Sequence, residues 1–297
     1  MKNRIVLLVL MSFVFYTPSA LIAQVIGGSS QGSSIDTPRD DIFDHIHTEF
    51  KKPIPYSPLR EADVIYSKRV WQVIDFREKI NQPFYYPLKD HLQWKSLITV
   101  ILDAVKSGEL TAYSAFHDGV LDDEFTTPMS VSEVEELIGG TEKTQEQYDI
   151  DGNFIGNKVI KEGQMSKAEI KKMRIKEVWY FDKQRSQMQV RILGLCPVWE
   201  RIDPETMQPQ KTPLFWIYFP EARPTLARAE VFNRKNDAQR RTYDDIFWKR
   251  MFSSYIYKEE NVYDRMISEY AIGMDALIES ERIKNELFEL ESYMWEY

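Results

Sequence analysis

The sequence predicts an α+β fold, with a helical N-terminal half packed with a small, mostly antiparallel sheet and a C-terminal amphipathic helix. Two observations carry this prediction. Apolar residues recur at helical spacing early in the chain and again at its end, whereas residues 188–192 alternate between apolar and polar side chains, as in a strand. The strands are grouped among mixed helices, which favours α+β over a parallel α/β fold.

The first 23 residues have the three-part pattern of a secretory signal peptide. Lys2 and Arg4 precede an almost wholly apolar run over residues 5–16, and small residues follow up to Ala23. That run is shorter than the roughly 20 residues that a membrane-spanning helix needs. We therefore expect export to the periplasm, with cleavage after Ala23.

Cys196 is the only cysteine, so the chain cannot form an internal disulfide. Cysteine is among the most frequently buried residue types, and a buried thiol is the expected state. No cysteine follows the signal peptide, so the mature chain cannot carry the lipid of a bacterial lipoprotein. We expect any association with the outer membrane to depend on a partner.

Residues 24–60 are interpreted as a flexible or extended N-terminal arm. The arm begins with a Gly/Ser-rich stretch and continues with three prolines and the aromatic residues Phe43, Phe50 and Tyr56. These rings could dock on the chain's own domain, which we place at residues 61–297, or on a neighbouring molecule.

Two helices are predicted in the first part of this domain. Ser57 and Pro58 form a favourable helix start, and Pro83 is expected to end the helix near Gln82. The apolar residues between them have helical spacing: Tyr66, Val70, Val73, Ile74 and Ile80. The second helix spans residues 96–110 and is apolar on most sides, with Gly108 placed to end it.

The remaining elements are shorter. Ser130 with Glu133, and Thr242 with Asp245, are spaced as helix-capping pairs. Residues 141–163 are expected to form a long loop or loose hairpin. Strands are predicted within residues 175–195, 213–220 and 253–260, and the final acidic helix carries one apolar face: Ile283, Leu287, Leu290 and Met294.

No pattern of catalytic, cofactor-binding or metal-binding residues stands out. His45 and His47 have no credible third ligand, and residues 149–160 lack the glycine and glutamate positions of an EF-hand loop. The acidic clusters at residues 122–124 and 244–245 are more typical of a solvated turn and a helix start. The acidic pI of about 5.3 also argues against a nucleic-acid partner.

The aromatic residues are the best candidates for a functional surface. Trp71 has the spacing of a core residue but could also anchor an interface. Phe84, Tyr85 and Tyr86 follow the expected helix end and are typical of a protein interface, where Tyr and Trp carry much of the binding energy. Because Pro87 restricts Tyr86 to an extended conformation, we expect one tyrosine to pack inward and the other to point outward.

Several long segments resemble the GldN/PorN family of the gliding motility and type IX secretion machinery of Bacteroidetes. The similarity covers most of the mature chain in the same order, and residues 141–163 match least. The segments that carry it include READVIYSKRVWQVIDFREKINQPFYYP, ILDAVKSGELTAY, DDEFTTP, FWIYFPEARPTLARAEVFNRKNDAQRRTYDDIFWKRMFSSYIYKEEN and GMDALIESERIKNELFELESYMW.

The resemblance implies a non-enzymatic structural role in the periplasm. Members of this family look like soluble partners of an outer-membrane lipoprotein, GldK/PorK, with which they form a ring complex. They are also thought to meet the periplasmic part of the inner-membrane motor, GldL/GldM. The alternatives are a periplasmic hydrolase that uses paired carboxylates and a periplasmic ligand-binding protein. The first requires a cleft with perturbed carboxylates, whereas an assembly component requires exposed apolar patches.

Export of the chain is the first testable prediction. Because residues 1–23 have the basic, apolar and small-residue pattern of a signal peptide, the mature protein should begin at Gln24 and lie in the periplasm. Mass spectrometry of the protein purified from its native envelope checks this. An uncleaved chain recovered from the cytoplasm would contradict it.

Overall fold

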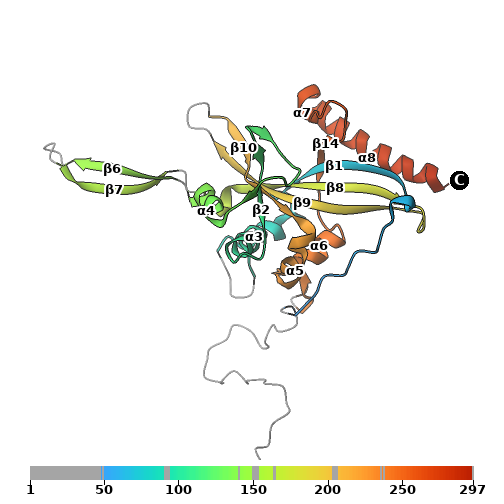
Figure 1. The fold of residues 1–297 in the computed structure, drawn as a ribbon, viewed down its shortest axis with the longest axis horizontal. Coiled ribbons are helices and arrows are strands. Elements are labelled where there is room, and N and C mark those ends of the chain that lie inside the picture. Colours follow the sequence, from blue (N-terminus) through green and yellow to red (C-terminus); the bar gives the residue numbers. More distant parts are fainter. Residues whose placement is uncertain are drawn as a thin grey trace, which may run out of the picture. The chain divides into compact units, whose positions relative to one another are not determined.

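A computed structural model describes residues 48, 50–89, 94–139, 141–148, 154–162, 165–202, 207–234, 236 and 238–295. Phe43, His45 and His47 lie outside this range, as does the expected signal peptide. None of the helices in the described ranges combines the length and apolar character that crossing a membrane requires. Within these ranges the chain forms a large antiparallel sheet with helices packed on it (Figure 1).

The central sheet has eight strands, and every pairing in it is antiparallel. The order is β14-β1-β8-β9-β11-β2-β5, with β10 also paired to β9. Its strands are β1 (Val64–Asp75), β2 (Ala112–Ser114), β5 (Pro128–Met129), β8 (Ile170–Asp182), β9 (Gln187–Ile202), β10 (Pro209–Pro213), β11 (Phe215–Tyr218) and β14 (Tyr255–Glu259). Three two-stranded pairs accompany it: β3 (Phe116–His117) with β4 (Val120–Leu121), β6 (Thr141–Tyr148) with β7 (Phe154–Glu162), and β12 (Glu230–Val231) with β13 (Arg241–Thr242).

The helices vary in length, from the four residues of α2 and α7 to the 22 residues of α8. They are α2 (Gln82–Tyr85), α3 (Leu97–Lys106), α4 (Val131–Gly139), α5 (Phe219–Arg228), α6 (Tyr243–Trp248), α7 (Ile267–Tyr270) and α8 (Met274–Trp295), with 3-10 turns η1 (Glu61–Asp63) and η2 (Lys167–Glu169). The fold is α+β and ends in a long helix, but the described part of its N-terminal half is not mainly helical and its sheet is not small. This part of the prediction was wrong.

The error arose in the segment that was expected to be a helix from Ser57 to Gln82. It forms β1, which pairs with β14 on one side and β8 on the other. Residues 70–74 are buried without interruption, so they lack the two-residue alternation of a half-exposed strand and mimic helical spacing. Pro83 lies in the first turn of α2, where its missing N–H is no loss, so it begins a short helix and does not end one.

Other local predictions are confirmed. Ser96 caps α3, and Gly108 adopts a positive φ of 76° just after that helix. The Ser130–Glu133 and Thr242–Asp245 pairs make their reciprocal capping hydrogen bonds. Within residues 141–163, strands β6 and β7 pair as a hairpin, which was one of the two alternatives considered. The sequence does not predict helix α5: Pro220 has the pattern of a strand end but lies in the first turn of this helix.

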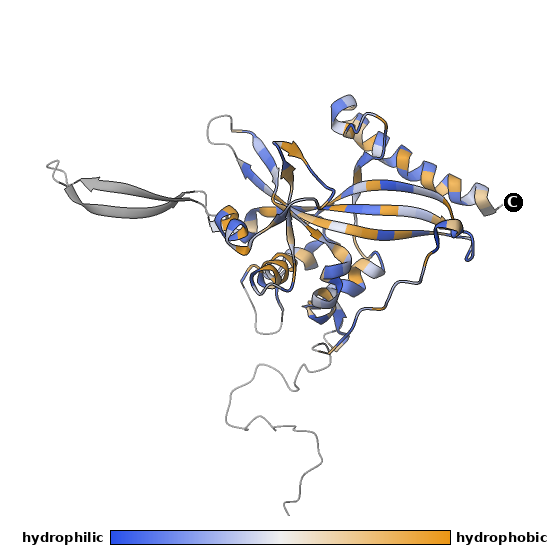
Figure 2. Ribbon diagram, viewed as in Figure 1, coloured by the Kyte–Doolittle hydropathy of each residue, from blue (hydrophilic) through white to orange (hydrophobic). Residues whose placement is uncertain are grey.

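One face of the sheet carries two apolar clusters. The larger includes the buried side of α3, which is apolar along much of its length (Figure 2), with residues of α5 and α6. The smaller joins Val70 of β1 and Ile256 of β14 to Ile283 and Leu287 of α8. The Ser280 hydroxyl of α8 also accepts a hydrogen bond of 2.9 Å from the backbone N–H of Ile256. Helix α8 therefore covers part of the terminal strand of the sheet.

A buried carboxylate lies on the same face as these two clusters. Glu177 of β8 is fully buried and accepts hydrogen bonds from Arg250 at 2.7 and 3.2 Å. The side chains of Gln72 and Trp179 donate two more, at 3.0 and 3.1 Å. Four donated bonds from strands β1 and β8 and from the segment before β14 replace the water that the carboxylate loses.

Trp71 lies on the opposite face, in a third cluster with Ala115, Cys196 and Trp216. The Lys176 and Lys258 ammonium groups lie 5.5 and 4.6 Å from the centre of its ring. Its burial agrees with the core interpretation. Cys196 is also buried, as expected, and this burial raises the pKa of its thiol to about 12.

Gly194 is required where the aromatic ring of Phe125 presses on β9. A Cβ at this position would lie 2.5 Å from the Phe125 ring. The close approach allows Phe125 to contact Trp216 and to lie beside the Lys176 ammonium group. The loop between β4 and β5 is held on the sheet in this way.

The Glu177 cluster leads to a prediction about stability. Replacing Arg250 with Ala would leave the buried carboxylate without its counter-ion, so we expect a loss of about 3–5 kcal/mol in the free energy of unfolding. Adding Glu177→Gln should recover part of that loss. The matched control is Arg69→Ala, because the Arg69–Glu260 pair is half-exposed on both sides and should contribute less than about 1 kcal/mol. Denaturant unfolding measures all three; equal effects of Arg250→Ala and Arg69→Ala would refute this account.

Candidate interaction surface

The last part of the N-terminal arm is anchored on the chain's own domain. The Thr48 hydroxyl donates a buried hydrogen bond of 2.7 Å to Glu230. Lys51 forms an ion pair with Asp245 and donates to the Thr242 hydroxyl at 3.1 Å. Burial opposes ionisation of Asp245, but its hydrogen bonds with Lys51 and Thr242 outweigh this and lower the pKa of the carboxyl.

Tyr56 is the aromatic anchor of the arm. Its ring centre lies 4.4 Å from the Arg223 guanidinium, 5.0 Å from that of Arg191 and 5.4 Å from the ring of Trp248. Arg223 is itself held by a buried ion pair with Asp244 at 2.9 Å. Burial is the main cause of the raised pKa of the Tyr56 phenol. Of the two alternatives for the arm, the described part docks in cis.

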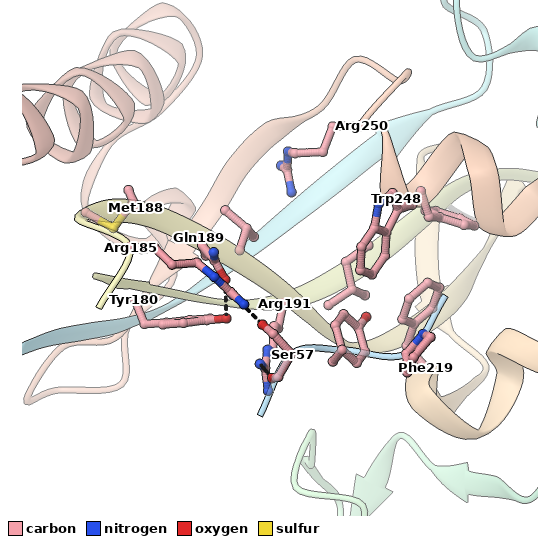
Figure 3. A pocket seen from close by; sticks show the side chains of 14 residues that line it. Ser57, Tyr180, Arg185, Met188, Gln189, Arg191, Phe219, Trp248 and Arg250 are labelled. Atoms are coloured by element: carbon pink, nitrogen blue, oxygen red, sulfur yellow. Dashed lines mark hydrogen bonds between the residues drawn. The ribbon is translucent and has the colours of Figure 1, made fainter. Parts of the chain in front are cut away.

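Beside Tyr56 lies a cavity of about 480 Å³ (Figure 3). Arg191 lines this cavity, and its guanidinium donates a hydrogen bond of 2.6 Å to the carbonyl of Ser57. The cavity adjoins residues 187–193 of β9, which pair only with β8 among the described strands. An open strand edge is prone to unwanted pairing, and the arm partly shields this one.

The cations of this cavity already have partners. Arg250 binds Glu177, Arg185 lies 3.7 Å from Asp182, and the guanidinium of Arg191 stacks on Tyr56 and Tyr180. The arrangement therefore resembles a docking site for the arm more than a site for chemistry.

A second hollow lies where the segment after β1 meets β12, and we call it the Tyr86 groove. Its volume is about 640 Å³, and its accessible wall is mainly apolar. Three cationic residues line it, and no carboxylate does. The groove is defined by Lys79, Ile80, Gln82, Pro83, Tyr86, Phe232, Asn233, Arg234 and Arg241.

Helix α2 sets the direction of the three rings that were singled out from the sequence. Phe84 is buried against Phe76, Tyr243 and Phe247. Tyr85 packs partly against the same cluster, and its hydroxyl donates a 2.8 Å hydrogen bond to the carbonyl of Ala168. Tyr86 has an extended backbone and is 52% exposed. One tyrosine points inward and the other outward, as predicted.

The six aromatic candidates that the structure describes thus differ widely in accessibility. Trp71 and Phe84 are interior residues, while Tyr56 and Tyr85 are largely occupied by contacts within the chain. Phe50 and Tyr86 expose 79% and 52% of their surface. Among the described candidates, these two have rings free to contact another molecule.

The carboxylates that were considered for catalysis have structural partners. Asp122 accepts hydrogen bonds from the Glu124 backbone and the Thr126 hydroxyl, and Asp245 caps α6. Burial opposes the ionisation of both, but these hydrogen bonds prevail, so the pKa of each is lowered. A general acid requires the opposite shift. Within the described ranges, no group of three histidine, cysteine or acidic residues is placed to hold a metal.

Sequence reasoning missed the part of the groove contributed by residues 232–234 and 241. Phe232 is 49% exposed and stacks edge-on against Trp94, with ring centres 5.4 Å apart. Its neighbours Arg234 and Arg241 bring positive charge to the groove. The segment FNRKN did offer a signal, an aromatic residue followed by two cations, but only the tertiary fold places it beside Tyr86.

Fold and surface together define an α+β sheet protein with an exposed groove suited to macromolecular contact. The sequence model of the family described as "Gliding motility associated protein GldN" matches residues 59–296. The chain therefore belongs to the GldN family, as its motifs had suggested. That description names an association with motility and no enzymatic reaction. A search of curated proteins finds no match.

The two adjacent tyrosines provide a matched pair of variants. Tyr85→Ala should lower the free energy of unfolding by about 2 kcal/mol, because it removes packing area and a hydrogen bond worth about 1 kcal/mol. Tyr86→Ala should change it by less than about 0.5 kcal/mol but weaken assembly with partner proteins. Thermal melting and co-purification measure the two effects. If Tyr86→Ala is stable and assembles fully, Tyr86 is not an interface residue.

Proposed function

We propose that this GldN-family protein is a non-enzymatic structural component of the gliding motility and type IX secretion machinery. In this proposal it is exported to the periplasm and forms a ring complex with an outer-membrane lipoprotein of the GldK/PorK type. It also meets the periplasmic part of the GldL/GldM motor. Family membership supports the link to motility, and the more specific role rests on the resemblance of the motifs.

The Tyr86 groove is the observation that carries the structural role. Soluble monomers rarely display large apolar hollows that serve no purpose. This hollow combines two half-exposed aromatic rings, Tyr86 and Phe232, with the cations Lys79, Arg234 and Arg241. Tyr and Arg are enriched in protein interfaces, where a rigid ring can be immobilised with little loss of conformational entropy.

The way the arm is held also supports an assembly role. Thr48, Lys51 and Tyr56 attach the described part of the arm to β12, α6 and α5, respectively, through polar and cation–π contacts. These contacts hold the described part of the arm in one place on the domain. An arm fixed in this way suits a component that must reach a neighbour at a defined position.

Membrane association should depend on the lipoprotein partner. The chain lacks a lipid-carrying cysteine after its signal peptide, so we expect it to sediment with outer membranes only while the lipoprotein is present. Fractionation of wild-type and lipoprotein-deletion strains, followed by immunoblotting, measures this. A periplasmic protein unrelated to the machinery serves as the control for trapping. Sedimentation that persists in the deletion strain would count against the proposal.

A further inference from the structure

Helix α8 has a second apolar stripe that faces away from the sheet. Its inner face packs Ser280, Ile283 and Leu287 against the domain. Residues three, four and seven positions apart share one side of a helix. On the outer side, this spacing aligns exposed residues over three turns and more: Met274, Leu277, Ile278, Glu281, Asn285 and Phe288.

This outer stripe is acidic as well as apolar. Helix α8 contains six carboxylates and two cations, a net charge of −4. Arg282 is occupied by Glu279 and Glu286. Glu281 and Glu289 are exposed and form no ion pair with any residue that the structure describes. The stripe therefore offers two available carboxylates near the Ile278 and Phe288 side chains.

The Tyr86 groove has the complementary properties. Lys79 and Arg234 are exposed, and neither forms an ion pair with a described residue. The Ile80, Tyr86 and Phe232 side chains are each about half-exposed around them. An apolar wall with two available cations thus matches an apolar stripe with two available carboxylates.

We propose that the outer stripe of α8 in one copy occupies the Tyr86 groove of a second copy. This inference rests on the proposed function, since it supplies the contact between neighbouring copies in the assembly. The contact joins two different surfaces, so each added copy presents one unused stripe and one unused groove. Such head-to-tail contacts generate rings when the rotation between copies closes, and filaments when it does not.

Charge argues against the simpler pairing of α8 with α8 of another copy. Two helices of net charge −4 would repel each other, and like charges placed opposite one another are destabilising. Pairing with the cationic groove reverses the sign of this interaction. It also covers aromatic surface on both sides, which provides most of the favourable free energy at an interface.

Cysteine cross-linking between two differently marked copies tests the contact. One preparation, lacking residues 1–23, carries Phe232→Cys, and the other carries Phe288→Cys. The native Cys196 is fully buried and its pKa is about 12, so it should not compete. Melting temperatures confirm that both variants fold, which their exposed positions favour. Under mild oxidation, the mixture should yield a cross-linked dimer several-fold more abundant than in the control mixture of Val120→Cys with Phe288→Cys.

Charge reversal provides a second, independent test of the contact. Lys79→Glu with Arg234→Glu in the groove copy should abolish the cross-link, and Glu281→Lys with Glu289→Lys in the helix copy should restore it. Raising the salt concentration from 0.1 to 1 M shortens the screening length from about 10 to about 3 Å, so the yield of the unmodified pair should fall.

Two results would overturn the inference. One is a mixed yield equal to that of the Val120 control, and the other is a predominance of Phe288→Cys homodimers, which would indicate α8–α8 contact. Lipoprotein-dependent sedimentation of the unmodified chain is measured in parallel. If that sedimentation is retained while the cross-link fails, only this inference falls. If the sedimentation is independent of the lipoprotein, the proposed function falls as well.

Discussion

The buried Glu177 carboxylate is the interaction on which the arrangement of the sheet and its helices depends. A carboxylate without water must be surrounded by donors, and its donors come from three places in the chain: Gln72, Trp179 and Arg250. A shift of β1 by one residue along β8 would turn Gln72 to the other face. The same register sends Val70 toward α8 and Ile74 into the larger cluster. The hydrogen bonds to Glu177 therefore select the register of β1 on β8 that both apolar clusters require.

The sequence predicted the ends of the helices better than the type of the central strand. Capping at Ser96, Ser130 and Thr242 depends on side chains within a few residues of the helix start. A short stretch of sequence is therefore enough to predict it. The identity of β1 depends on β8 and β14, whose paired residues lie about 100 positions or more away. Apolar residues that face both sides of a sheet leave no simple period. The β-branched and aromatic content of the stretch from Val70 to Ile74 was the remaining signal.

The candidate surface was predictable only in part, for a related reason. Tyr86 stood out because it follows the expected helix end and because Pro87 constrains its backbone. Its partner Phe232 lies about 150 residues further along the chain, and no local pattern connects the two. The number of aromatic residues in a segment also overstates the surface available for binding, because Trp71 and Phe84 are buried in the core. Which rings remain exposed is decided by the sheet and α2 together.

Charged residues in this fold divide into two groups, which differ in the free-energy cost of losing a partner. The Arg223–Asp244 and Arg250–Glu177 pairs are wholly or partly buried, and removing one partner would leave a costly unpaired charge. The second group is exposed to water, so each member can gain or lose a partner at a small cost in free energy. It includes Lys79, Arg234, Glu281 and Glu289. An exposed pair adds less than about 1 kcal/mol, so these charges orient a contact, whereas the nearby rings supply most of its free energy. A surface with such charges favours a partner of opposite charge. The chain also remains stable without that partner, as a subunit must before it is assembled.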